Sequence, residues 1–245
     1  MTLELTIRDG LRETYSDIIT DQAWRIIEKL APFDDERRRL MTERTQRRAD
    51  RFAQGQPLSF LPENATIGGA DISVRDARAG KFDGSDIPPG LQRQWIQGTG
   101  PATRPGAPTE KSIRNVAYAL LSGADGWMFD GEDAVGQVDT MSLENQRNLK
   151  LAIARDPVFT KAAEAVAKEM NTWAEDFFGK PIIDDWKKQL DFTTVIFRAR
   201  GLHLDDRHVA RQDGGGFSAS IVDAVLYVAN NHAALRQAER PVVLY

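Results

Sequence analysis

The chain has 245 residues, with 32 Lys and Arg against 36 Asp and Glu, a formal net charge of −4 and 41% hydrophobic residues. This composition is typical of a globular protein and excludes collagen-like and disordered chains. There is no cysteine, which excludes disulfides, a thiolate nucleophile and cysteine-bound zinc or iron–sulfur clusters. Mild acidity favours neither nucleic acid nor a membrane surface as a partner, and without a long apolar run or a signal-peptide pattern we expect a cytoplasmic protein.

Residues 1–92 are expected to form a helical and loop region. Apolar residues at helical spacing predict a helix over residues 20–30, ended by Pro32, and a second helix from Asp34 or Asp35 to about residue 53. The second helix carries seven arginines with acidic residues between them, which favours a solvated face over a phosphate-binding one. Residues 55–92 are rich in Gly, Pro and Asp and are expected to form loops with short strands at best.

From residue 93 onward, strands are expected to alternate with helices. Strand candidates lie at residues 95–99, 126–130, 193–197 and 242–245, with helices near 109–121, 142–154, 157–177 and 218–237 and a polar loop before the last helix. This alternation is typical of parallel βα units, in which functional residues lie beyond the carboxyl ends of the strands. We therefore expect an α/β fold with a site that includes Glu132, Asp133 and Arg198.

Two other motifs have plain structural explanations. Residues 214–219 (GGGFSA) fit a dinucleotide-binding pattern, but a polar segment precedes them where such a loop needs a strand, so a flexible loop is favoured. The spacing of His203, Asp205, Asp206 and His208 suits one divalent metal ion. Hydrogen bonds to backbone or carboxylate groups explain both histidines equally well, so metal binding is the less favoured interpretation.

Acidic residues follow the second strand candidate, and arginines end the third. The carboxylates of Asp130, Glu132 and Asp133 repel one another unless a cation or an arginine compensates their charge. In the structural alternative, Asp133 caps the next helix and Asp130 is solvated. Arg198 and Arg200 share one face until the strand ends. An arginine there can hold a small carboxylate or stabilise a developing negative charge, and a salt bridge to Glu132 or Asp133 is the alternative.

Several motifs together resemble malate synthase in its shorter, A-type form, from about residue 31 to the C-terminus. They are LSFLPE at 58–63, TGP at 99–101, EK at 110–111, MFDGED at 128–133, NQRNL at 145–149 and RARGLH at 198–203. The resemblance implies a TIM barrel that condenses acetyl-CoA with glyoxylate to malate and CoA, with Mg²⁺, as a transferase of the glyoxylate cycle. It also implies that Arg198 is the catalytic residue, holding glyoxylate and stabilising the enolate. Glu132 and Asp133 would support the waters on the metal without binding the ion.

The sequence departs from the family pattern at several points. Gly131 replaces a phenylalanine, and the turn between Pro101 and Glu110 is longer than usual. The Mg²⁺ ligands and the aspartate base of the family are expected beyond residue 245, and four strand candidates are half of a barrel. We therefore expect residues 93–245 to form the first half of a TIM barrel, truncated in its fourth strand. Such a chain is expected to be poorly active or inactive alone, unless a second chain or an oligomer completes the barrel.

Two alternatives stay open at this point. A citrate-lyase β-like lyase or aldolase also pairs an arginine with Mg²⁺-bound carboxylates, although the LSFLPE and RARGLH motifs favour the synthase. A catalytically silent binding or assembly module would keep its role if Arg198 were changed to Lys. A site that needs a planar guanidinium would not tolerate that substitution.

Overall fold

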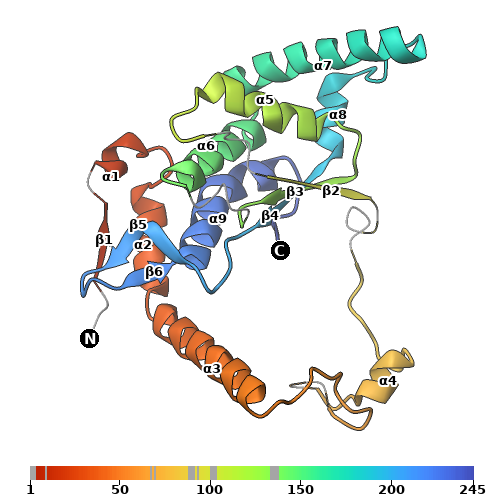
Figure 1. The fold of residues 1–245 in the computed structure, drawn as a ribbon. Helices are drawn as coiled ribbons and strands as arrows, with labels where there is room; N and C mark the ends of the chain where they lie inside the picture. Colours follow the sequence, from red (N-terminus) through yellow and green to blue (C-terminus); the bar gives the residue numbers. More distant parts are fainter. Residues whose placement is uncertain are drawn as a thin grey trace.

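The protein is described by a computed structural model, which covers residues 4–8, 10–66, 68, 70–87, 92, 94–99, 104–132 and 138–245 (Figure 1). The elements in chain order are β1 (Leu5–Ile7), α1 (Leu11–Thr14), α2 (Asp21–Leu30), α3 (Phe33–Ala53), α4 (Val74–Arg78), β2 (Trp95–Thr99), α5 (Thr109–Leu120), β3 (Gly126–Asp130), α6 (Met141–Ile153), α7 (Pro157–Phe178), α8 (Trp186–Phe192), β4 (Thr194–Arg198), β5 (Asp205–Arg211), β6 (Gly216–Ser218), α9 (Ala219–Gln237) and β7 (Val243–Leu244).

Four strands form a parallel sheet in the order β2-β3-β4-β7. The register aligns the ends of neighbouring strands, with Asp130 of β3 opposite Arg198 of β4. Every residue of β3 is buried, as expected for a central parallel strand. All four strands lie at or within two residues of their predicted positions, so a mixed α/β fold with a parallel sheet is confirmed. The described residues form no closed barrel.

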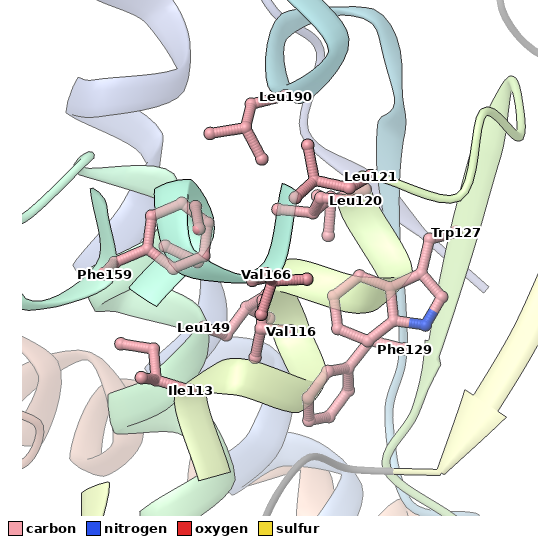
Figure 2. Packing of buried hydrophobic residues seen from close by; sticks show 14 of the residues in the cluster. Ile113, Val116, Leu120, Leu121, Trp127, Phe129, Leu149, Phe159, Val166 and Leu190 are labelled. Atoms are coloured by element: carbon pink, nitrogen blue, oxygen red, sulfur yellow. The ribbon is translucent and has the colours of Figure 1, made fainter. Parts of the chain in front are cut away.

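Helices α5, α6 and α7 contribute with α9 to the buried cluster on one face of this sheet. Figure 2 shows Trp127 and Phe129 of β3 in this cluster, beside side chains of α5, α6 and α7. Phe197 of β4 stacks between Phe129 and Tyr227 of α9, with ring centroids 5.5 and 4.6 Å apart. Because side chains alternate along a strand, the residues next to these aromatic rings point to the opposite face.

A second buried cluster joins the N-terminal helices to the C-terminal part of the chain. Ile18 and the α2 residues Trp24 and Ile27 pack with Val222 and Leu226 of α9. Both predicted N-terminal helices are present as α2 and α3, and α9 lies between the two clusters. One helix therefore contributes side chains to the core on the sheet and to the core around α2.

Strands β1, β5 and β6 form an antiparallel sheet beside this second cluster. The sequence predicted a polar loop before the last helix, where β5 and β6 lie, and that prediction was wrong. β5 buries Asp206 and His208 instead of apolar residues on its inner side, so its period-two pattern was not visible as hydrophobic alternation. β1 was missed because it has only three residues.

Helix α3 leads away from the body of the molecule, and α4 lies far from the parallel sheet (Figure 1). Residues 55–92 were expected to be loops with short strands, but their described part also contains α4. This helix begins where the Ser73 hydroxyl accepts the backbone N–H of Asp76 at 3.1 Å, an ordinary helix cap. An isolated bridge joins Thr66 to Ser73. The short helices α1 and α8 were also not predicted.

Candidate functional site

Polar side chains gather at the carboxyl end of the parallel sheet. Asp130 ends β3 and Arg198 ends β4, and both alternate with aromatic residues that face the helices. They therefore point to the face opposite these helices. Gln97 of β2 belongs to the same face, so three neighbouring strands supply one cluster. This is the edge at which the sequence predicted a site.

Arg198 is held by two carboxylates. Its Nη1 donates to Oδ2 of Asp130 at 2.9 Å, and its Nη2 lies 3.4 Å from Oε2 of Glu132. The guanidinium carbon is 5.9 Å from the centre of the Tyr245 ring. The side chain is 30% exposed, so a solute can reach it. The ion pair with Glu132 was the structural alternative for Arg198, and it is present, but the guanidinium has more N–H donors than these two contacts use.

Asp130 is the buried member of the cluster. Its Oδ2 also accepts from Nε2 of Gln97 at 2.6 Å, and its Oδ1 accepts the backbone N–H of Glu132 at 3.0 Å. The residue is only 6% exposed, so the interpretation of Asp130 as solvated was wrong. Gln97 was missed because a lone amide carries no motif. Its place two residues before the end of β2 was the one available signal.

Two glycines permit close approaches around Glu132. A Cβ on Gly201 would lie 2.8 Å from Oε1 of Glu132 and 2.8 Å from Nδ1 of His203, so this glycine lets the carboxylate and the imidazole approach each other. A Cβ on Gly131 would lie 2.6 Å from the carbonyl oxygen of Arg198, which accepts the Gly131 N–H at 2.9 Å. The glycine that departs from the family pattern is therefore required by this backbone contact.

Arg200 lies outside the cluster, because β4 ends at Arg198 and the chain then turns toward α9. Its Nε and Nη2 donate to the two carboxylate oxygens of Asp223 at 2.8 and 2.7 Å, and Nη2 also donates to Asp206 at 2.6 Å. Burial opposes the charge, yet the two carboxylates raise the pKa of Arg200 above its ordinary value. With 2% of its side chain exposed, Arg200 is a structural residue, and Asp223 was the partner that the sequence did not reveal.

The proposed metal ligands between residues 203 and 208 do not come together. His203 and Asp205 are exposed, whereas Asp206 is buried against Arg200. His208 is also buried, and desolvation lowers its pKa. In the part of the chain that the structure describes, no group of three or more His, Cys, Asp or Glu residues is placed to hold a metal ion.

Asp130 and Glu132 do not form a Mg²⁺ ligand set by themselves. Both oxygens of Asp130 already accept hydrogen bonds, and Glu132 faces a guanidinium whose charge opposes a cation at the same place. Asp133, which was expected to act with Glu132, lies outside the described residues. These carboxylates fit hydrogen bonding to water, and Mg²⁺ in proteins usually keeps several waters.

Residues 214–219 lie in the turn between β5 and β6, in β6 and at the start of α9. Gly214 has φ +84°, and the Ser218 hydroxyl accepts the backbone N–H of Ile221 at 3.3 Å to cap the helix. The segment follows an antiparallel strand, so it lacks the parallel βα setting of a dinucleotide loop.

The chain is similar to malate synthases from several organisms. The chain is 31% identical over 208 residues to the malate synthase of Streptomyces clavuligerus, covering 84% of this chain and 32% of that protein. It is 29% identical over 217 residues to the malate synthase of Myxococcus xanthus, covering 89% and 33%. It is 25% identical over 235 residues to malate synthase A of Escherichia coli, covering 96% and 37%. The predicted resemblance is confirmed.

The chain spans about a third of the length of the curated relatives it matches. No family model matches it. Among the described residues, no helix combines the length and apolar character needed to cross a bilayer.

Proposed function

Because the chain is homologous to malate synthases over most of its length, we propose that it carries the glyoxylate-holding arginine of that reaction. The overall reaction is the condensation of acetyl-CoA with glyoxylate to malate and CoA, a step of the glyoxylate cycle. Residues 93–245 would be the first half of a TIM barrel, and residues 1–92 an N-terminal helical and loop region. Four parallel strands with helices on one face and polar residues at their carboxyl ends support this assignment.

The observation that carries the proposal is the position of Arg198 at the end of β4. Asp130 and Glu132 fix the plane of the guanidinium, which leaves N–H donors for the carboxylate of glyoxylate. When a carboxylate base takes a proton from the acetyl methyl group of the thioester, negative charge develops on the carbonyl oxygen of the thioester. The positive charge of Arg198 stabilises that oxygen more in the transition state than in the ground state.

Mg²⁺ belongs to the same proposal. When bound, the ion would polarise the aldehyde that the enolate attacks. The described carboxylates do not constitute its ligands, so the role proposed for Glu132 and Asp133 is to accept hydrogen bonds from water on the metal. A cytoplasmic location, with a second chain or an oligomer completing the barrel, is likewise proposed.

The proposal is tested by measuring the affinity of the chain for glyoxylate with titration calorimetry, in the presence and in the absence of Mg²⁺. Arg198→Lys keeps the charge but loses the planar fork, and we expect it to weaken binding about tenfold or more. Arg114→Lys, at a half-exposed arginine that binds Glu169, is the matched control and should bind as the wild type does. Equal affinity of wild type and Arg198→Lys would refute the role of Arg198, whatever turnover the chain shows.

A further inference from the structure

We propose that a groove along α3 binds phosphate groups of an anionic ligand. The groove has a volume of about 530 Å³ and lies between one face of α3 and the loop that follows β4. We name it the arginine groove. Arg38, Arg44 and Arg48 line it from the helix, His203 lines it from the loop, and Asp205 lines it from the start of β5. In the sequence, the acidic residues interleaved with these arginines favoured a solvated face, and the structure shows the partners of four of these acids.

Asp34 of α3 pairs with Arg37 and Arg38, which both line the arginine groove. Three other acids of α3 are bound outside it. Glu36 and Glu43 both pair with Arg39, which does not line the groove. Asp35 pairs with Arg211 of β5 at 2.6 Å. The ion pairs with Arg39 and Arg211 hold these three acids away from Arg44 and Arg48. The alternation of charge along the chain therefore does not neutralise those two groove arginines.

Arg44 and Arg48 are the free cations of the groove. They are four residues apart on one helix face, both are exposed, and neither forms an ion pair with an acid in the described ranges. Asp205, the acid that lines the groove, already accepts from Arg37 at 2.8 Å. Two guanidinium groups one turn apart can bind neighbouring phosphate oxygens through paired hydrogen bonds. The groove therefore fits a diphosphate better than a single carboxylate.

The arginine groove lies next to the Arg198 cluster, and His203 is the residue between them. His203 lines the groove, and its Nδ1 lies as close to the Cβ position of Gly201 as Oε1 of Glu132 does, at 2.8 Å. Glu132 in turn lies 3.4 Å from Arg198. An extended ligand with phosphates in the groove can therefore point its other end toward Arg198. CoA is such a ligand, and a free inorganic oligophosphate shares only its phosphate groups. The identification of CoA as the ligand rests on the proposed function, whereas the phosphate site does not.

Titrations of the chain with inorganic pyrophosphate, CoA and pantetheine test the site. Pantetheine carries the thiol arm of CoA without its phosphates. The groove variant is the double substitution Arg44→Gln with Arg48→Gln. The matched control is Arg47→Gln with Arg51→Gln, which removes the same charge from the same helix at residues that do not line the groove.

We expect the groove variant to weaken pyrophosphate binding at least tenfold, and the control variant to change it less than twofold. CoA binding above that of pyrophosphate, with pantetheine weak, identifies CoA as the source of the phosphates; equal binding of CoA and pyrophosphate identifies a free oligophosphate. Absence of pyrophosphate and CoA binding in the wild type, or an equal loss in both variants, overturns the proposal. Arg198→Lys should leave pyrophosphate binding unchanged, so failure of the glyoxylate site and failure of the groove are separate results.

Discussion

Arg198 and Arg200 lie two positions apart, but the same substitution should reduce stability by very different amounts at the two positions. Arg200→Met removes the positive charge between Asp206 and Asp223, whose side chains are 0% and 4% exposed. Arg198→Met removes a guanidinium that is 30% exposed and lies beside Asp130, which keeps its other hydrogen bonds. We therefore expect a large loss of stability at position 200 and a small one at position 198.

The magnitude follows from burial. Removing one partner from a buried ion pair costs about 3–5 kcal/mol, because the remaining charge is left in a poorly solvated place. Here one guanidinium serves two carboxylates, although Asp206 keeps the backbone N–H groups of His208 and Val209 at 2.7 Å each. Those bonds favour the lower half of the range, about 3 kcal/mol. For Arg198→Met the partial exposure reduces the expected loss to about 1 kcal/mol.

Urea unfolding of both variants and the wild type at pH 7 measures the two losses. Arg200→Lys keeps the charge without the bidentate contacts, so its loss of stability should be smaller than that of Arg200→Met but measurable against the wild type. Equal losses of stability for Arg198→Met and Arg200→Met would refute this reasoning.

Three further predictions concern buried groups. The Tyr227 hydroxyl is buried without a hydrogen-bond partner among the described residues, so Tyr227→Phe should keep the ring stack and raise the free energy of unfolding by about 1 kcal/mol; a loss in urea unfolding would contradict this. Burial lowers the pKa of His208, so below pH ~6.5 the unfolded chain binds a proton that the folded chain does not. As the pH decreases from there to the folded-state pKa of His208, the free energy of unfolding should decrease by about 1.4 kcal/mol per pH unit. His208→Gln should flatten the pH dependence of urea unfolding over that interval, and an unchanged slope would exclude His208 as its source. Gly131→Ala should destabilise the chain by about 1–3 kcal/mol, because its Cβ meets the carbonyl oxygen of Arg198, and unchanged stability would show that the strand ends shift freely.

Much of the parallel half of the fold was predictable because its signals are local. β3 and β4 are short runs of apolar or β-branched residues that end in charged residues, and both begin or end within one residue of the prediction. The same reasoning placed Arg198 at a strand end. The barrel interpretation depended on strands that would have to close a sheet, and local patterns say nothing about closure.

The rest depended on contacts between distant residues. Asp223 lies 23 residues after Arg200, and no spacing rule links an acid on one helix to an arginine after a strand. β5 was missed because it buries the polar side chains of Asp206, which binds Arg200, and His208. Gln97 joined the site through the strand register, which a single sequence does not specify. In each case the missing information was the partner, not the residue type.

Helix α9 has a consequence for how the molecule holds together. Its Tyr227 and Leu235 belong to the cluster on the parallel sheet, while Val222 and Leu226 belong to the cluster around α2. Asp223 of the same helix accepts hydrogen bonds from the backbone N–H and Nε of Arg200, and so fixes the loop that follows β4. A disturbance that detaches α9 from either neighbour therefore also loosens the other, and the α2 region and the sheet should open as one cooperative unit, with the amide hydrogens of α9 the slowest to exchange with solvent.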